Sequence, residues 1–140
     1  MSDREDRMVL DTGMLTEEQL NLLVTHLPFE ISFVDEEDTV VFFNKTERRA
    51  FDRSPGAIGR KVQHCHPHRS LHRVERILDA FRAGERDTAE FWLEHEGRFV
   101  HVRYLAVRDR ERRYRGCLEV AQDATELRAL RGERRLLDGE

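Results

Sequence analysis

Five short stretches of the chain either alternate apolar and polar residues or are rich in β-branched and aromatic residues, and these patterns predict five β-strands. The stretches cover residues 30–34, 39–43, 88–94, 99–108 and 114–122. In one of them, Val100, Val102 and Tyr104 fall on one face, while His101 and Arg103 fall on the other. The first two stretches form one group and the last three form another. Short polar segments separate the stretches within each group, so we expect neighbouring strands to pair as antiparallel hairpins.

Three other segments place apolar residues three or four positions apart, as amphipathic α-helices do. They cover residues 17–26, 68–83 and 125–137. The first begins with a capping box formed by Thr16 and Gln19 and ends before Pro28. The second ends at Gly84, which suits the left-handed conformation that often closes a helix.

The order of these elements predicts an α+β fold: a five-stranded antiparallel sheet with short helices on one face. We expect a flexible amino terminus over residues 1–14 and a flanking helix within residues 15–27. The core of the domain then covers residues 28–124, and a carboxyl-terminal helix of the signalling type covers residues 125–140. At 140 residues, the chain has the length of a single domain.

Composition narrows the classes of function. The formal net charge is -4, and acidic and basic residues are interleaved, which argues against a nucleic-acid partner. No apolar run approaches the roughly 20 residues that a membrane-spanning helix needs. The amino terminus lacks the apolar segment of a signal peptide, so we expect a cytoplasmic protein with no membrane partner. Two cysteines, Cys65 and Cys117, do not make a disulfide framework.

Several short motifs in the chain point to a family resemblance. They are Phe42-Phe-Asn-Lys45, Ile58-Gly-Arg-Lys-Val62, Cys65-His66-Pro67, Ala89-Glu-Phe-Trp92, Val102-Arg-Tyr104 and Asp123-Ala-Thr-Glu126. With the order of elements, they resemble the PAS domain, and in particular a group found behind hemerythrin-like domains in uncharacterised prokaryotic proteins. The resemblance covers about residues 25 to 138. It implies a sensory or interaction module that forms a homodimer and is not an enzyme, with a small molecule or haem-like cofactor between sheet and helices.

The segment from His64 to His72 contains four of the seven histidines and one of the two cysteines. By the resemblance, Cys65 and His66 border the ligand cavity, where they could bind a cofactor or a metal. The alternative is that Cys65 is a small buried residue and His66 a capping residue. His72 falls opposite the apolar face of its helix, so we expect it to point to solvent.

The resemblance adds Pro67, Asn44, Trp92 and Arg103 to the candidate cofactor-binding residues. If Arg108 pairs with Tyr114, Arg103 lies opposite Glu119, which predicts a cross-strand ion pair on the outer face. If that face lines the cavity instead, Arg103 becomes an anchor for an anionic ligand. A tryptophan such as Trp92 is more often a core or interface residue than a cofactor contact.

Three functions therefore remain open. The first is a PAS sensory module that binds a small ligand and relays its signal through a homodimer. The second is a PAS interaction module whose cavity is filled by its own side chains. The third is a small metal- or redox-responsive protein that uses Cys65. The sequence does not name a ligand, and haem is one candidate.

Overall fold

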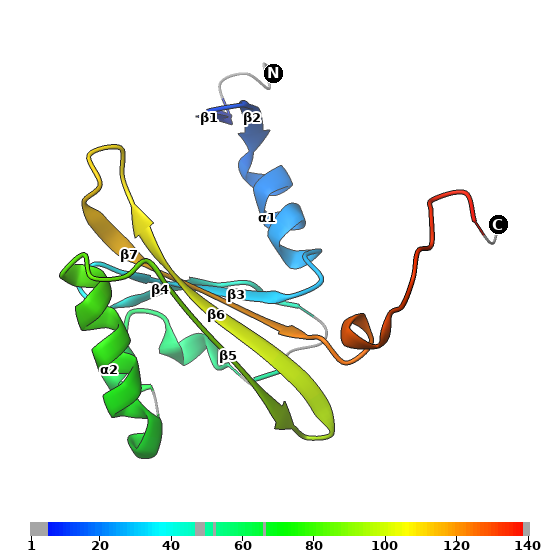
Figure 1. The fold of residues 1–140 in the computed structure, drawn as a ribbon. Helices are drawn as coiled ribbons and strands as arrows, with labels where there is room; N and C mark the ends of the chain where they lie inside the picture. The colour runs from blue at the N-terminus through cyan, green and yellow to red at the C-terminus, as the bar shows by residue number, and fades with distance from the viewer. Residues whose placement is uncertain (1–5, 47–49, 52, 66, 139–140) are drawn as a thin grey trace.

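The computed structural model describes residues 6–46, 50–51, 53–65 and 67–138. Its centre is a five-stranded antiparallel sheet in the order β4-β3-β7-β6-β5 (Figure 1). The strands are β3 (Glu30–Asp35), β4 (Val40–Phe43), β5 (Thr88–His95), β6 (Arg98–Arg108) and β7 (Tyr114–Asp123). The predicted α+β fold is therefore confirmed.

Helix α2 (His68–Arg82) covers one face of this sheet (Figure 1). Its apolar stripe includes Val74, Leu78 and Phe81, which join Val100 and Val102 of β6 in the hydrophobic core. Two single-turn 3-10 helices, η1 (Pro55–Ala57) and η2 (Val62–His64), precede α2. Ser54 caps η1 by accepting a hydrogen bond from the Gly56 amide. The face of the sheet towards α2 is called the inner face below.

The carboxyl-terminal end of α2 is fixed to the strands by charged side chains. Arg82 pairs with Asp38 in the β3–β4 turn. Arg108 of β6 donates to the Phe81 carbonyl at 2.7 Å and to the Asp87 carboxylate at 2.8 Å. These contacts hold the last turn of α2 against both halves of the sheet, whereas apolar packing holds its middle.

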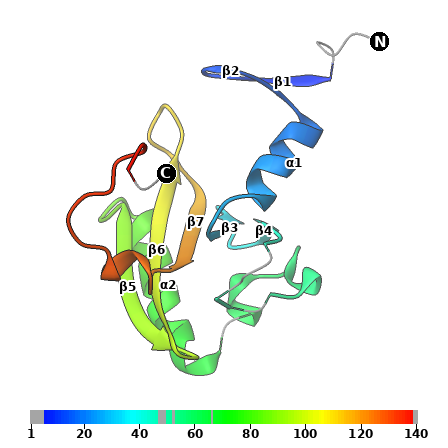
Figure 2. The same cartoon turned by 90° about the vertical axis from the view of Figure 1, so that its right-hand side faces the viewer.

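The amino-terminal arm differs from the expected flexible segment. Two strands, β1 (Arg7–Leu10) and β2 (Gly13–Thr16), form a hairpin that leads into α1 (Glu17–Thr25). The expected helix and its capping box are present, with Thr16 and Gln19 bonded reciprocally. The arm extends away from the sheet (Figures 1 and 2). Its side chains Leu22 and Leu23 are therefore about half exposed, at 48% and 54%.

The expected carboxyl-terminal helix over 125–137 is largely absent. Only a 3-10 turn, η3 (Leu127–Ala129), forms there, and the chain then runs away from the sheet (Figure 1). Gly132 adopts a positive φ of 63° and interrupts the helical path. Helices this short are marginal without a packing partner, and Leu130, Leu136 and Leu137 are exposed. No described helix is long and apolar enough to cross a membrane.

The pairing of β6 with β7 departs from the predicted register. Arg108 pairs with Tyr114 as expected, but Val107 pairs with Gly116, so Arg115 is an extra residue in β7. This β-bulge shifts every later pair by one position. Arg103 consequently lies opposite Val120, and the predicted Arg103–Glu119 pair is wrong. Tyr104 is the residue opposite Glu119, so both side chains are on the inner face.

Gly116 makes this bulge sterically feasible. Its φ is +150°, a region that side-chain-bearing residues rarely adopt. A Cβ atom there would lie 2.4 Å from the Val34 carbonyl oxygen and 2.6 Å from Cζ of Phe33. Because β3 approaches β7 so closely at this point, glycine is the residue that fits.

Candidate functional site

A cavity of about 30 Å³ lies between the inner face and α2. One or two water molecules fill such a volume. Apolar side chains make up half of its lining, and polar side chains from β3, β6, β7 and the loop before η1 complete it. The lining residues are Ser32, Val34, Val40, Arg53, Val62, Cys65, Val74, Ile77, Leu78, Tyr104, Cys117 and Glu119.

Three of these residues form a polar cluster at the sheet. Nη2 of Arg53 donates to Oε1 of Glu119 at 2.5 Å, and the two side chains are 20% and 15% exposed. Tyr104 lies directly opposite Glu119 in the pairing of β6 with β7. Burial, and then the Glu119 carboxylate, raise the pKa of Tyr104 far above its ordinary value. Tyr104 therefore stays protonated at physiological pH, and Glu119 accepts a hydrogen bond from Arg53.

Glu30 helps to position Arg53. Its buried carboxylate accepts hydrogen bonds from the amides of Ala50 and Phe51 at 2.5 and 3.1 Å. These bonds fix the chain just ahead of Arg53, and the Ser54 cap fixes it just after. The Nε atom of Arg53 is itself buried and has no hydrogen-bond partner among the described residues. The cluster thus contains one buried donor that makes no hydrogen bond within the described residues.

Both cysteines of the chain line the cavity as free thiols. Cys65 follows η2 and is partly exposed, whereas Cys117 lies in β7 and is 3% exposed. Burial, and then Glu119, raise the pKa of the Cys117 thiol to about 12. Cys117 is therefore a neutral thiol at physiological pH, and Cys65 is the more accessible of the two.

Among the residues that the sequence selects as ligand contacts, the structure places Cys65 at the cavity. His66 lies outside the described residues, so its position as a cofactor or metal ligand remains an expectation. Pro67 is exposed at the start of α2 and does not line the cavity. Trp92 and Arg103 are also exposed, and they belong to the face of the sheet opposite the cavity.

Asn44 is buried, but it braces the backbone and does not line the cavity. Its amide nitrogen donates to the carbonyls of Val24 and Phe29 at 2.8 and 3.1 Å. Its side-chain oxygen accepts from the Ile31 amide at 2.8 Å. Asn44 therefore joins the end of the α1 segment to β3 and β4.

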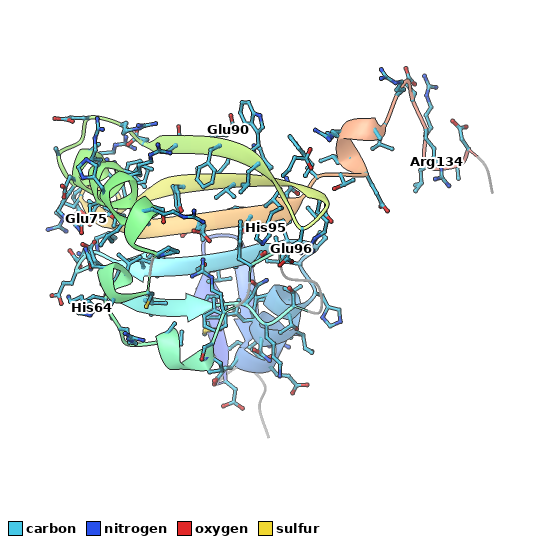
Figure 3. The ribbon with its side chains drawn as sticks, turned by 90° about the horizontal axis from the view of Figure 1, so that it is seen from below. His64, Glu75, Glu90, His95, Glu96 and Arg134 are labelled. Atoms are coloured by element: carbon cyan, nitrogen blue, oxygen red, sulfur yellow. The ribbon has the colours of Figure 1, made fainter. Side chains whose placement is uncertain are left out.

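The described histidines do not assemble into a metal site. His64 and His72 are exposed, as expected for His72, and Figure 3 shows His64 far from His95 at the β5–β6 turn. Within the described part of the chain, no group of three or more His, Cys, Asp or Glu residues could hold a metal ion. Haem binding would require a much larger cavity than the one of about 30 Å³ in this structure.

Sequence reasoning missed Arg53, Glu119, Tyr104, Ser32 and Cys117 as members of one site. For Glu119 a signal was present, because a glycine inside a strand pattern suggests a bulge, and Gly116 is that glycine. Reading the bulge would have turned Glu119 to the face of Tyr104. Arg53 has no such signal, since its position depends on the contacts of Glu30 with a loop.

Comparison with protein families matches residues 20–125 to the PAS domain. Among solved structures, a C-terminal domain from Streptococcus mutans is 37% identical, with a TM-score of 0.83, and the match covers 89% of this chain and 97% of that one. No curated protein matches the sequence.

More distant structures share the fold. A sensory box sensor histidine kinase from Vibrio cholerae is 16% identical with a TM-score of 0.54, over 76% of this chain and 89% of that one. The Vibrio cholerae VqmA dimer is 17% identical with a TM-score of 0.54, over 89% of this chain and 61% of that one. At such identities the likeness concerns the fold alone.

Proposed function

Because the chain belongs to the PAS domain family, we propose that it is a sensory module in which a small molecule bound in the cavity changes a homodimer. PAS domains are generally sensory modules without catalysis, and one structure with the same fold is that of a sensor histidine kinase. In this proposal the chain performs no reaction. It converts occupancy of the cavity into a change at its dimer interface.

The observation that carries the ligand-binding part is the polar cluster of Arg53, Glu119 and Tyr104 inside the cavity. Replacing a buried ion pair by apolar residues of similar volume often leaves a protein equally or more stable. Packing alone therefore gives little reason to keep these three side chains next to six aliphatic ones. A molecule that uses the cluster gives such a reason.

The dimer part rests on apolar surface outside the core. Leu20, Leu22 and Leu23 of α1 are 40%, 48% and 54% exposed, and Trp92 is 60% exposed. Exposed apolar patches of this kind commonly mark interaction surfaces. VqmA, whose fold is similar, is described as a dimer, which supports the same assembly for this chain.

Native mass spectrometry of the purified full chain tests the ligand. We expect a small-molecule adduct that is lost on denaturation. Ile77→Trp, which fills the cavity, should abolish the adduct, whereas Arg73→Trp on the exposed side of α2 should keep it. Ligand binding would be contradicted if the chain carried no adduct after expression in any host cell and if no small molecule stabilised it against heat.

The small volume of the cavity favours one alternative, the interaction module with a self-filled cavity. In that case the Ile77→Trp variant would still form the dimer, and no adduct would ever be detected. The two functions therefore separate on the adduct, while both predict a dimer.

A further inference from the structure

We propose that the ligand of this cavity is a neutral, compact and largely apolar molecule that presents one hydrogen-bond acceptor to Arg53. The inference rests on the function proposed above, because it concerns the same cavity. It follows from three properties of the lining: an unused donor, a balanced charge and aliphatic walls.

The unused donor is Nε of Arg53. Nη2 of the same guanidinium is occupied by Glu119, whereas Nε is buried without a partner among the described residues. A buried N–H that makes no hydrogen bond is unfavourable, because it has lost its hydration without compensation. Glu119 accepts from Nη2 and not from Nε, and no other described acceptor bonds to Nε. What this cluster lacks is a further acceptor, such as a carbonyl oxygen, a hydroxyl oxygen or a ring nitrogen.

The charge of the lining is balanced. Arg53 and Glu119 are the charged residues among those that line the cavity, and they neutralise each other at 2.5 Å. An anion that approached Arg53 would therefore also meet the Glu119 carboxylate. A cation that approached Glu119 would meet the guanidinium. Either charged ligand would lose its hydration without gaining an unopposed partner, so a neutral ligand is favoured.

The remaining walls are aliphatic and define the rest of the molecule. They come from three parts of the fold: Val34 and Val40 from the sheet, Val62 from η2, and Val74, Ile77 and Leu78 from α2. A ligand larger than one or two waters needs α2 to move outward. The ion pair of Arg82 with Asp38 fixes the carboxyl-terminal end of this helix, so its preceding turns are the part that can yield. A molecule of a few heavy atoms needs the smallest such movement.

Three probes with one carbon skeleton test the charge: isobutyramide, isobutyrate and isobutyramidinium. Each is titrated into the full-length ¹⁵N-labelled chain, and binding is followed by the amide resonances of Ser32, Cys65 and Cys117. We expect isobutyramide to bind at least tenfold more tightly than either charged probe. Equal or tighter binding of a charged probe would overturn the inference and leave the ligand cavity intact. If none of the three binds the folded protein, the inference fails, and the native mass spectrometry described above decides ligand binding separately.

Two variants test the residues. Glu119→Gln removes the negative charge beside Arg53, so isobutyrate should bind at least tenfold more tightly than to the parent, whereas the exposed Glu111→Gln should change nothing. Arg53→Lys keeps the positive charge but removes Nε, so isobutyramide should bind about tenfold more weakly. An unchanged affinity of Arg53→Lys for isobutyramide would overturn the role of Arg53. If a variant does not fold, the comparison of the three probes in the parent chain still decides.

Discussion

The inner face of the sheet carries Glu30 and Ser32, each only 4% exposed, whereas the opposite face carries Phe42 and Trp92, which are 37% and 60% exposed. Stability alone favours the reverse arrangement, because buried polar groups and exposed apolar groups both cost free energy. The difference teaches that the two faces serve different contacts. Inside, Glu30 holds the Ala50–Phe51 segment and Ser32 lines the cavity, whereas outside the apolar Phe42 and Trp92 are open to solvent.

The largest expected effect comes from breaking the bulge that assigns residues to the two faces. Gly116→Ala should lower the free energy of unfolding by about 3 kcal/mol or more, because the new Cβ would overlap the backbone of β3. Gly97→Ala is the control, since Gly97 has a φ of 78° but open space around it. It should cost only about 1 kcal/mol. Urea denaturation measures both, and equal losses would show that the close approach to β3 does not matter.

Gly116 also shows how far the sequence could be read. Strand alternation and helical spacing are local properties, and they predicted the five strands, α1 and α2. The register of β7 depends on one extra residue, and a shift of one residue reverses the face of every later side chain. For that reason Glu119 was assigned to the wrong face, and the site that it forms with Tyr104 was not foreseen.

The candidate site was harder to predict than the fold, because its members are far apart in the chain. Cys65 was foreseen through a motif, and it does line the cavity. Arg53 reaches Glu119 across 66 positions, and no local pattern reports such a contact. The helix expected over 125–137 is largely absent because so short a helix is marginal without a packing partner.

The next largest effect concerns the outer face and the arm. We expect a homodimer at micromolar concentration, and Trp92→Glu or Leu23→Glu should raise its dissociation constant ten- to a hundredfold, about 1.4–2.7 kcal/mol. Thr88→Glu, on the same strand face, and Asn21→Glu, on the same helix, introduce the same charge at polar positions and should change little. Sedimentation over a range of concentrations measures this. A monomeric parent chain would remove the explanation for the exposed residues.

A smaller effect is the pH dependence of stability, which distinguishes the buried thiol of Cys117 from the partly exposed thiol of Cys65. The pKa of Cys117 is raised to about 12 in the folded chain, whereas an unfolded cysteine titrates near pH 9. Between these values the unfolded state binds fewer protons, so the free energy of unfolding falls as pH rises, by about 1.4 kcal/mol for each pH unit. Burial also raises the pKa values of Tyr104 and Tyr114. Their titration therefore lowers the free energy of unfolding further as the pH rises above 10.

Urea denaturation between pH 8 and pH 10 measures this dependence. Cys117→Ala should remove the decrease between pH 9 and pH 10, and Cys65→Ala should retain it. A parent chain whose stability is constant over this range would contradict the burial of Cys117.

The smallest effect on stability is expected at the entrance of the cavity. Cys65 is partly exposed and Cys117 is buried and neutral, so a thiol reagent should modify Cys65 at least tenfold faster in the native chain. Modification of Cys65 should change the free energy of unfolding by less than about 1 kcal/mol. Because Cys65 lines the cavity, its modification should nevertheless prevent the binding of isobutyramide. Equal slow rates for both thiols, with fast reaction only after unfolding, would mean that the inner face has no opening at Cys65 and that a ligand enters elsewhere.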